Sequence, residues 1–372
     1  MIFVGGVPFE RNSICQGSCD LVALMEHPAL VSASLSFKAI PEKKFSTSDA
    51  SSDEFTNGKH VYLFQREYAT VDPGLVDLIG TDEATTCVGV VFRNRENGMI
   101  SVAHLDSPKI VDLGLSQMLS RLVDCKHDSE IDVHLIGGFE DTPYKHTAHT
   151  GSGSNLEHDG HSFPLCAKII EALGKSVVKF HIQTLFVLSH NTKTDAAGNA
   201  LPMFSGLLVE TKTGTVIPAT FDGTTRCPDE LVRRIRISAS FEDSRWRNKL
   251  LETYDSRTDQ FIIAPCSWSK RLVDMASLLQ QFPDAEVLRI CSTSPSAEAP
   301  DFVETHRRLW NYLIQHPNWT ETFRMGEPRV FTRTGYGGWI MVEQGSLFQL
   351  PQQLKSFCSQ RTSMDVGEEG RE

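Results

Sequence analysis

One pair of apolar segments, separated by a short polar turn, constrains the fold of this chain more than any other feature. Cys87 opens the apolar segment Val88–Phe92, a polar turn follows, and Met99–Ala103 then runs into His104. Apolar runs that flank such a turn indicate an antiparallel β-hairpin. The outer ends of two paired strands lie together. The sequence therefore predicts that a thiol and an imidazole meet at one end of a sheet, and thiol nucleophilic catalysis needs these two groups.

Strand and helix patterns follow one another irregularly along the rest of the chain. The predicted strands are joined mostly as hairpins, with few regular β-α-β crossovers. We therefore expect an α/β (α+β) fold with a mostly antiparallel two-sheet sandwich core flanked by helices. The other predicted strands are His60–Gln65, Ile131–Ile136, Phe180–Leu188, Leu207–Glu210, Thr215–Ala219, Ile235–Ser240, Gln260–Ile263, Glu286–Ile290 and Pro328–Thr332, and the predicted helices are Asp20–His27, Ile110–Val123, Pro164–Leu173, Lys270–Gln280 and Asp301–His316.

Composition narrows the classes of function. The 372 residues are 40% hydrophobic, which is enough for a sizeable core. A net charge of −11 argues against a nucleic-acid surface or an anionic-membrane role. The nine cysteines are odd in number and include no Cys-x-x-Cys pair, which is typical of free thiols in a reducing compartment. Since no signal segment or membrane-length apolar run is evident, we expect a location in the cytoplasm, with the nucleus as the alternative.

The distribution of polar residues predicts one domain over 1–342, followed by a polar tail over 343–372. Segments 41–58 and 141–162 are expected to be mobile loops, the second an insertion. Two His-x-x-His pairs lie in the insertion, so we weighed a zinc site there. Structural zinc sites usually include cysteines, and this stretch is rich in Gly and Ser, so we expect no metal. The four histidines are His146, His149, His158 and His161.

Cys87 and His104 each have an ordinary structural explanation when taken alone. A single cysteine is most often an inert core residue, and a histidine at a strand end is more often packed than catalytic. Their placement by one hairpin, beside an exposed polar turn, raises the expectation of function for both. Other cysteines lack this context. Cys15 and Cys19 have no histidine at a useful position, and Cys266 lies in an apolar setting that favours burial.

Three motifs resemble a known family. Gly80–Cys87, Val133–Asp141 and Cys291–Glu304 are similar to segments of the eukaryotic protein N-terminal asparagine amidohydrolases. The resemblance covers most of Lys59–Val342 in one continuous order. The departures are the His-rich insertion, the polar segment that precedes Gly58 and the extended tail. None of them touches the segment that carries the cysteine and the histidine.

The interval from Cys87 to His104 also resembles bacterial chemoreceptor glutamine deamidases and the catalytic domains of deamidating toxins. In those proteins a threonine six residues before the cysteine orients the histidine, and Thr81 has that offset here. The alternative is that Thr81 only caps the turn. The resemblance implies attack of the Cys87 thiolate on a side-chain carboxamide, with a thioester intermediate. His104 would protonate the departing amine and then activate water, and no metal or organic cofactor is required.

Binding of an N-terminal asparagine needs two further features. A carboxylate or converging carbonyl oxygens must bind the free α-amino group. Tight walls must also misplace the longer glutamine, because one methylene alone discriminates by only ~1–3 kcal/mol. The predicted substrate-binding residues are Asp82, Glu83 and Thr86 near Cys87, with Phe139 as a wall, and Asp106, Glu140 and Asp141 are further carboxylate candidates. Each of these residues also has an ordinary structural explanation, as a turn former, a helix cap or a core side chain.

The resemblance further implies a place in the N-degron degradation pathway, where an arginyl-transferase acts on the aspartate product. The expected partners are proteins or peptides with a free N-terminal asparagine, with no nucleic acid and no membrane. Three alternatives stay open: a deamidase of internal Gln or Asn, a non-catalytic adaptor that binds N-termini, and a thiol protease. The presence of Thr81, Cys87 and His104 together speaks against the adaptor.

Overall fold

The predicted hairpin forms the centre of the molecule. In the computed structural model, which describes residues 1–10, 17–46, 58–123, 129–142, 160–335 and 337–342, β7 (Val88–Asn94) pairs antiparallel with β8 (Ile100–Leu105). The side chain of Asn94 organises the turn, since its Oδ1 accepts hydrogen bonds from two backbone N–H groups within the turn. The sequence prediction for this hairpin is therefore confirmed.

Eight strands form the larger sheet, and β7 lies within it between β8 and β9. β7 is antiparallel to both neighbours, whereas the adjoining β9, β10 and β1 run parallel. In spatial order the strands are β15 (Leu251–Glu252), β5 (Glu67–Val71), β8, β7, β9 (Glu130–Phe139), β10 (Lys179–Leu188), β1 (Ile2–Val4) and β2 (Val7–Pro8).

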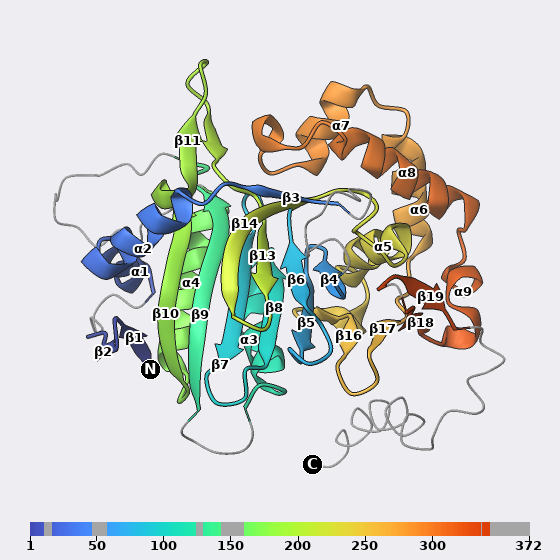
Figure 1. The fold of residues 1–372 in the computed structure, drawn as a ribbon. Helices are drawn as coiled ribbons and strands as arrows, with labels where there is room; N and C mark the ends of the chain where they lie inside the picture. Colours follow the sequence, from blue (N-terminus) through green and yellow to red (C-terminus); the bar gives the residue numbers. More distant parts are fainter. Residues whose placement is uncertain (11–16, 47–57, 124–128, 143–159, 336, 343–372) are drawn as a thin grey trace, which may run out of the picture.

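A five-stranded sheet packs against one face of the larger sheet (Figure 1). The two sheets approach closely at Gly89, where an added Cβ would lie 2.7 Å from the Leu207 side chain. The predicted sandwich is confirmed, and its strand pairings are mostly antiparallel. In spatial order the strands are β3 (Lys43–Phe45), β14 (Thr215–Phe221), β13 (Leu207–Glu210), β6 (Leu78–Thr81) and β4 (His60–Leu63).

Two smaller sheets complete the strands of the described residues. β11 (Thr192–Thr194) and β12 (Ala200–Pro202) form a hairpin that projects at the top of Figure 1. The other small sheet holds strands from the C-terminal third, namely β16 (Tyr254–Asp255), β17 (Gln260–Ile263), β18 (Arg329–Arg333) and β19 (Trp339–Met341).

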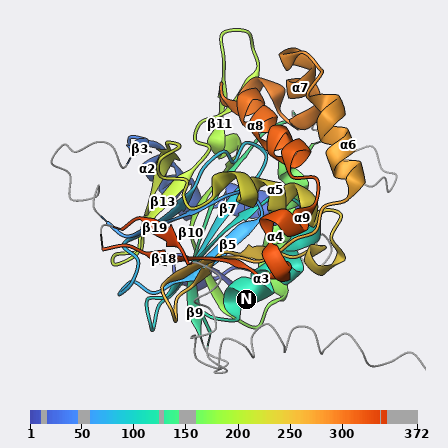
Figure 2. The same ribbon diagram turned by 90° about the vertical axis from the view of Figure 1, so that its right-hand side faces the viewer.

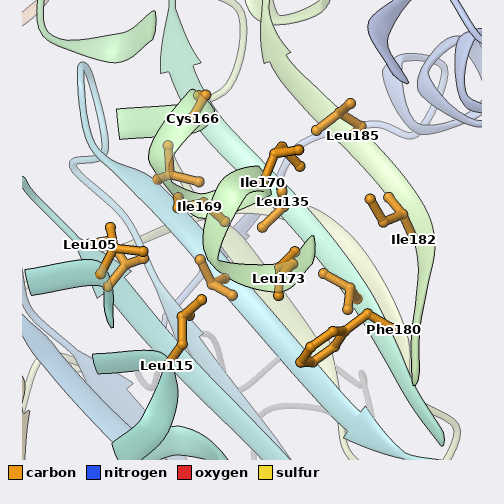
Figure 3. Close-up of a cluster of buried hydrophobic side chains, with 14 of the residues drawn as sticks. Leu105, Leu115, Leu135, Cys166, Ile169, Ile170, Leu173, Phe180, Ile182 and Leu185 are labelled. Carbon is orange, nitrogen blue, oxygen red and sulfur yellow. The ribbon is translucent and has the colours of Figure 1, made fainter. Parts of the chain in front are cut away.

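Helices cover the second face of the larger sheet. Figure 3 shows Ile169, Ile170 and Leu173 of α4 directed toward Leu135 and Ile182 of the sheet, and all five side chains are buried. This apolar stripe at helical spacing explains why the segment packs as a helix. The helices with residues in this core are α1 (Ser18–Met25), α2 (Pro28–Lys38), η1 (Pro108–Ile110), α3 (Val111–Leu119) and α4 (Ser162–Lys175).

The remaining helices of the described residues lie mainly beside the five-stranded sheet, where Figure 2 shows α6, α7 and α8 grouped together. Most of their buried side chains join the core between the two sheets. Their bounds are η2 (Ser189–Asn191), α5 (Glu230–Ser240), η3 (Ser244–Trp246), α6 (Lys270–Leu279), α7 (Asp284–Cys291), η4 (Pro295–Ala297), α8 (Phe302–Gln315), α9 (Trp319–Thr322) and η5 (Arg324–Gly326).

Two predicted strands are wrong, since both segments are helical. Ile235–Ser240 alternates apolar and polar residues, but it belongs to α5, in which Val232, Ile235 and Ala239 are buried at helical spacing. The alternation of apolar and polar residues suggested a strand with one exposed face, but Arg236, one of the polar residues, is also buried. Glu286–Ile290 lies within α7, which follows Pro283 and has acidic residues in its first turn. A preceding proline and acidic residues in the first turn are signals for the start of a helix. The short apolar run is compatible with either a strand or a helix, so it did not justify the prediction of a strand.

The predicted loops are described only in part. Segment 41–58 contains the short strand β3, so the loop expected there is interrupted, and 47–57 lie outside the described residues. Most of the 141–162 insertion and the 343–372 tail also lie outside them. No helix in the described part of the chain is long and apolar enough to cross a membrane. The single-domain assignment of 1–342 stays a prediction.

Candidate active site

Strand register places Cys87 and His104 on one face of the larger sheet. Val88 is paired with Leu105, and Gly89 is paired with His104. Side chains alternate between faces along a strand, so the side chains of Cys87 and His104 both lie toward the five-stranded sheet, as diagonal neighbours around Gly89. Because Gly89 carries no side chain, none intervenes between the thiol and the imidazole on β7. The shared sheet face expected from the sequence is therefore present, but no hydrogen bond joins the Cys87 thiol to the His104 imidazole within the described residues. Their direct contact stays a prediction.

The imidazole of His104 is held by a residue of the opposite sheet. Thr81 is the last residue of β6, and its Oγ1 lies 2.7 Å from Nδ1 of His104. Both residues are buried, and burial lowers the pKa of His104 to about 4. The tautomer in which Nδ1–H donates to Thr81 leaves a lone pair on Nε2. Nε2 has no hydrogen-bond partner among the described residues, so it is available to accept a proton.

Cys87 is buried, with 8% of the residue exposed. Its pKa is raised, first by burial and then by the negative charges of Asp106 and Glu298. The backbone around it is fixed by β9, since Gly138 N–H donates to the Cys87 carbonyl oxygen at 2.7 Å. A Cβ at Gly137 would lie 2.6 Å from that same oxygen, and the φ of Gly137 is +121°. Only glycine fits there, which explains the Gly-Gly pair at the end of β9.

The turn between β6 and Cys87 is held by two arginines that precede or belong to α5. Glu83 has a left-handed φ of +62° and makes a bidentate pair with Arg234, with both N–O distances 3.0 Å. Arg226 bridges the turn, contacting Glu83 at 2.6 Å and Asp82 at 3.1 Å. Such charge-assisted pairs are directional, so they define the conformation of the turn that carries Thr81 and Cys87.

These pairs bear on the predicted substrate-binding residues. Asp82 is also bonded to the Tyr62 hydroxyl at 2.6 Å and to the Phe221 N–H at 2.7 Å, so both of its oxygens are engaged within the fold. Glu83 is likewise occupied by its two arginines. These contacts hold the turn within the fold. A role of either carboxylate in substrate binding stays a prediction.

A second segment reaches the site from far along the chain. Thr86 forms a 2.9 Å hydroxyl contact with Thr293, which lies between α7 and η4. The Ser292 hydroxyl of the same segment donates to the Glu298 carboxylate. The negative charge of Glu298 contributes to the raised pKa of Cys87, after burial and Asp106. The sequence marks this segment as a motif but does not single out Glu298, because no local pattern indicates that the segment folds back toward Cys87.

Asp106 is the other carboxylate at Cys87. It follows Leu105, the partner of Val88, so it lies across from Cys87 in the sheet register. Its Oδ2 is held by Arg66 at 3.4 Å and by Gln65 at 3.3 Å. Its Oδ1 is buried and has no hydrogen-bond partner within the described residues. Buried carboxylate oxygens are normally paired, so an unpartnered one beside a nucleophile points to a missing donor.

Comparison with known proteins agrees with this geometry. Residues 50–341 match the family model described as protein N-terminal asparagine amidohydrolase. The chain belongs to this family. A protein N-terminal asparagine amidohydrolase of Arabidopsis thaliana is 54% identical over 91% of this chain and 99% of its own length. Proteins of the same name are 31% identical in Mus musculus, over 69% of this chain and 76% of that protein, and 29% identical in Homo sapiens, over 75% and 82%.

The other residues selected from the sequence have the following contacts within the fold. Phe139 is 3% exposed at the end of β9, where its N–H donates to the Thr85 carbonyl oxygen, so it packs behind the turn. Asp141 accepts hydrogen bonds from the N–H groups of His161 and Ser162 at the start of α4. Glu140 donates its own N–H to the Thr192 hydroxyl.

Of the four histidines in the predicted insertion, only His161 lies within the described residues. His146, His149 and His158 lie outside the described residues, and His161 stands at the start of α4. No group of three or more His, Cys, Asp or Glu that could hold a metal occurs within the described ranges. Cys266 is fully buried, as its apolar setting predicts, and Cys15 is outside the described residues.

Proposed function

We propose that this chain hydrolyses the side-chain amide of an N-terminal asparagine, giving N-terminal aspartate and ammonia through a Cys87 thioester. The observation that carries the proposal is the Thr81–His104 hydrogen bond, which leaves Nε2 of His104 unpartnered on the sheet face that Cys87 shares. A nucleophile, a base and a group that orients the base together form the minimum unit of covalent amide hydrolysis. The names of the family and its members support the same substrate.

The chemistry divides into two half-reactions. In the first, the Cys87 proton moves to Nε2 of His104 while the sulfur attacks the carboxamide carbon. Backbone N–H groups of the turn before β7 would hold the oxyanion. The imidazolium then returns the proton to the departing nitrogen, which leaves as ammonia. In the second, His104 takes a proton from water, hydroxide attacks the thioester, and the thiolate leaves and regains the proton. Every proton passes through Nε2, so no metal or organic cofactor is required.

The α-ammonium of the substrate would bind at Asp106 and Glu298. Both carboxylates act on Cys87, and Asp106 has a free oxygen that an ammonium would satisfy. Glu298 is paired with a serine hydroxyl, and no basic side chain of the described residues forms an ion pair with it. Two carboxylates beside the thiol thus take the role that the sequence assigned to Asp82 and Glu83, whose charges are already matched by arginines.

Matched peptides provide the direct test. We expect a peptide that begins with free Asn to gain about 1 Da, while its counterparts that begin with acetyl-Asn or free Gln react at least about 10²-fold more slowly, because each misplaces the amide or loses the ammonium contact. Intact-mass spectrometry over a time course measures all three. Faster reaction of the acetylated peptide would instead identify a deamidase of internal side chains, and cleavage of the backbone would identify a thiol protease.

The hydrogen bond that Thr81 accepts from Nδ1–H of His104 gives a second test. Thr81→Val keeps the shape of the side chain but leaves Nδ1 of His104 unpartnered, so the ring loses its orientation and kcat is expected to fall about 10²-fold. Thr81→Ser restores a hydroxyl and should retain most of the activity. The measurement is kcat for the Asn peptide at matched thermal stability. Equal kcat for the valine and serine variants would show that Thr81 only terminates β6.

We further propose that the protein works in the cytoplasm or nucleus, upstream of an arginyl-transferase in the N-degron pathway. Within the described ranges, Cys87, Cys166, Cys227, Cys266 and Cys291 are free thiols, which suits a reducing compartment. The aspartate product carries a free amino terminus, the group that an arginyl-transferase acylates. Imaging of the full chain with a C-terminal fluorescent tag tests the location, and a signal confined to the secretory pathway would contradict it.

A further inference from the structure

The electrostatic setting of Cys87 is the reverse of that expected for a resting reactive thiol. Reactive cysteines usually lie in electropositive surroundings that favour the thiolate. Here the two carboxylates that act on the thiol, Asp106 and Glu298, both oppose its ionisation, in addition to the effect of burial. The free protein therefore holds Cys87 as a neutral thiol beside a neutral imidazole.

The other charges near the site are balanced within the fold. Glu83 faces His104 from the turn after β6, and its charge is matched by Arg226 and Arg234. Glu67 faces His104 from β5 and is matched by Arg233 and Arg236. From β6 and β7 the neighbours of the imidazole are the neutral Thr81 and Gly89.

Asp106 and Glu298 differ from those balanced carboxylates. Arg66 reaches only Oδ2 of Asp106, and Oδ1 is buried without a partner in the described structure. Glu298 is held by Ser292, in a segment that Thr293 ties to Thr86, the residue next to Cys87. Two segments distant in sequence therefore each bring a carboxylate to the same thiol, and neither carboxylate is fully paired within the described residues. One bound cation could pair with both carboxylates.

We propose that the substrate's own α-ammonium binds between Asp106 and Glu298 and activates Cys87 by offsetting the negative charge of these two carboxylates. This inference rests on the proposed function and extends it, because the same contact that selects a free amino terminus also switches on the nucleophile. With the ammonium bound, the thiol proton passes more readily to Nε2 of His104. A chain whose amino terminus is acylated brings no positive charge and leaves Cys87 unreactive.

Alkylation of Cys87 measures the switch without any deamidation. The thiolate displaces iodide from iodoacetamide, and mass spectrometry of the peptide that contains Cys87 follows this one site. Glycinamide carries the ammonium but no side chain, so it can occupy the carboxylates and leave the thiol open. We expect glycinamide to accelerate alkylation at pH 7 about tenfold, which corresponds to a fall of one unit in the thiol pKa, whereas N-acetylglycinamide has no effect.

Variants that remove the charge of either carboxylate provide a second test by the same alkylation assay. Glu298→Gln and Asp106→Asn should each be alkylated about tenfold faster than the natural protein without ligand and should respond less to glycinamide, yet both should deamidate Asn peptides more slowly. Glu304→Gln, an exposed change on α8, is the matched control and should alter neither rate. A merely structural role would not make the thiol more reactive while lowering turnover.

The outcomes separate this inference from the proposed function. If Asn peptides are deamidated but glycinamide leaves alkylation unchanged or slows it, or if neither variant is alkylated faster, ammonium activation is wrong and the amidohydrolase proposal stands. If Asn peptides are not deamidated at all, the proposed function fails, whatever the alkylation rates show.

Discussion

Replacing Cys87 with alanine is expected to lower kcat for an Asn-initiated peptide by at least about 10³-fold, to the level of the uncatalysed reaction in the assay. The proposed thioester needs a sulfur at this position. His104 could still polarise a water molecule, but Nε2 would then have to act on a water that nothing in the described site holds in line with the amide. Cys87→Ser should be nearly as inactive, because a serine hydroxyl ionises far less readily than a thiol.

The fold should survive this change. Cys87 stands just before β7, its side chain is small, and the contacts that fix its backbone come from Gly138 and the turn rather than from the sulfur. Cys266→Ala is the matched control, since it also removes a buried thiol. Ammonia release and peptide mass report activity, and thermal unfolding reports the fold. Near-normal turnover by folded Cys87→Ala, free of contaminating enzyme, would eliminate the thioester mechanism.

The second large effect is expected on stability, at a buried ionic cluster behind the site. Glu67 on β5 and Arg233 and Arg236 on α5 have fully buried side chains. Glu67 accepts hydrogen bonds from Arg233 at 2.6 Å and from Arg236 at 3.2 Å. Glu67→Gln leaves two buried cations without their counter-charge, so the free energy of unfolding should fall by about 3–5 kcal/mol. That is a large share of the roughly 5–15 kcal/mol typical of a folded domain.

An exposed pair on the same sheet is the natural control. Glu130 pairs with Arg95 at 3.1 Å, with both side chains more than a third exposed. Solvent screens such a pair, so Glu130→Gln should change the free energy of unfolding by no more than about 1 kcal/mol. Chemical unfolding of the two variants, side by side, measures the difference. Equal stability of the two would mean that Glu67 does not stabilise α5 against the sheet.

The cluster also predicts a dependence on pH. Burial alone raises the pKa of Glu67, but the charges of Arg233 and Arg236 outweigh it and hold the pKa below the ordinary glutamate value. The unfolded chain therefore takes up the proton first as the pH falls. The stabilising contribution is complete above the unfolded pKa of about 4.3 and is lost as the pH falls through the lower folded value. The stability gap between the natural chain and Glu67→Gln should accordingly narrow in acid.

Sequence reasoning succeeded where the deciding interactions are local. The β7–β8 hairpin follows from two apolar runs and a turn organised by Asn94. The predicted strands Leu207–Glu210 and Thr215–Ala219 are also present, and they pair as the β13–β14 hairpin. Sequence reasoning failed for α5, where alternating apolar and polar residues predicted a strand in place of the observed helix. Arg236 is buried there only because Glu67, far away in sequence, provides its counter-charge.

Local and tertiary interactions also have separate roles at the candidate active site. The sequence by itself determined that Cys87 and His104 share a sheet face, because the register of one hairpin sets both positions. The family resemblance also pointed to Thr81, which reaches His104 from the opposite sheet. Tertiary structure alone decided the rest of their surroundings: arginines near α5 pair with Asp82 and Glu83, and the segment after α7 brings Glu298. Charges and hydrogen bonds act through space, and a chain that folds back on itself can bring any pair of segments together, so local pattern predicts the nucleophile and its base but not their electrostatic setting.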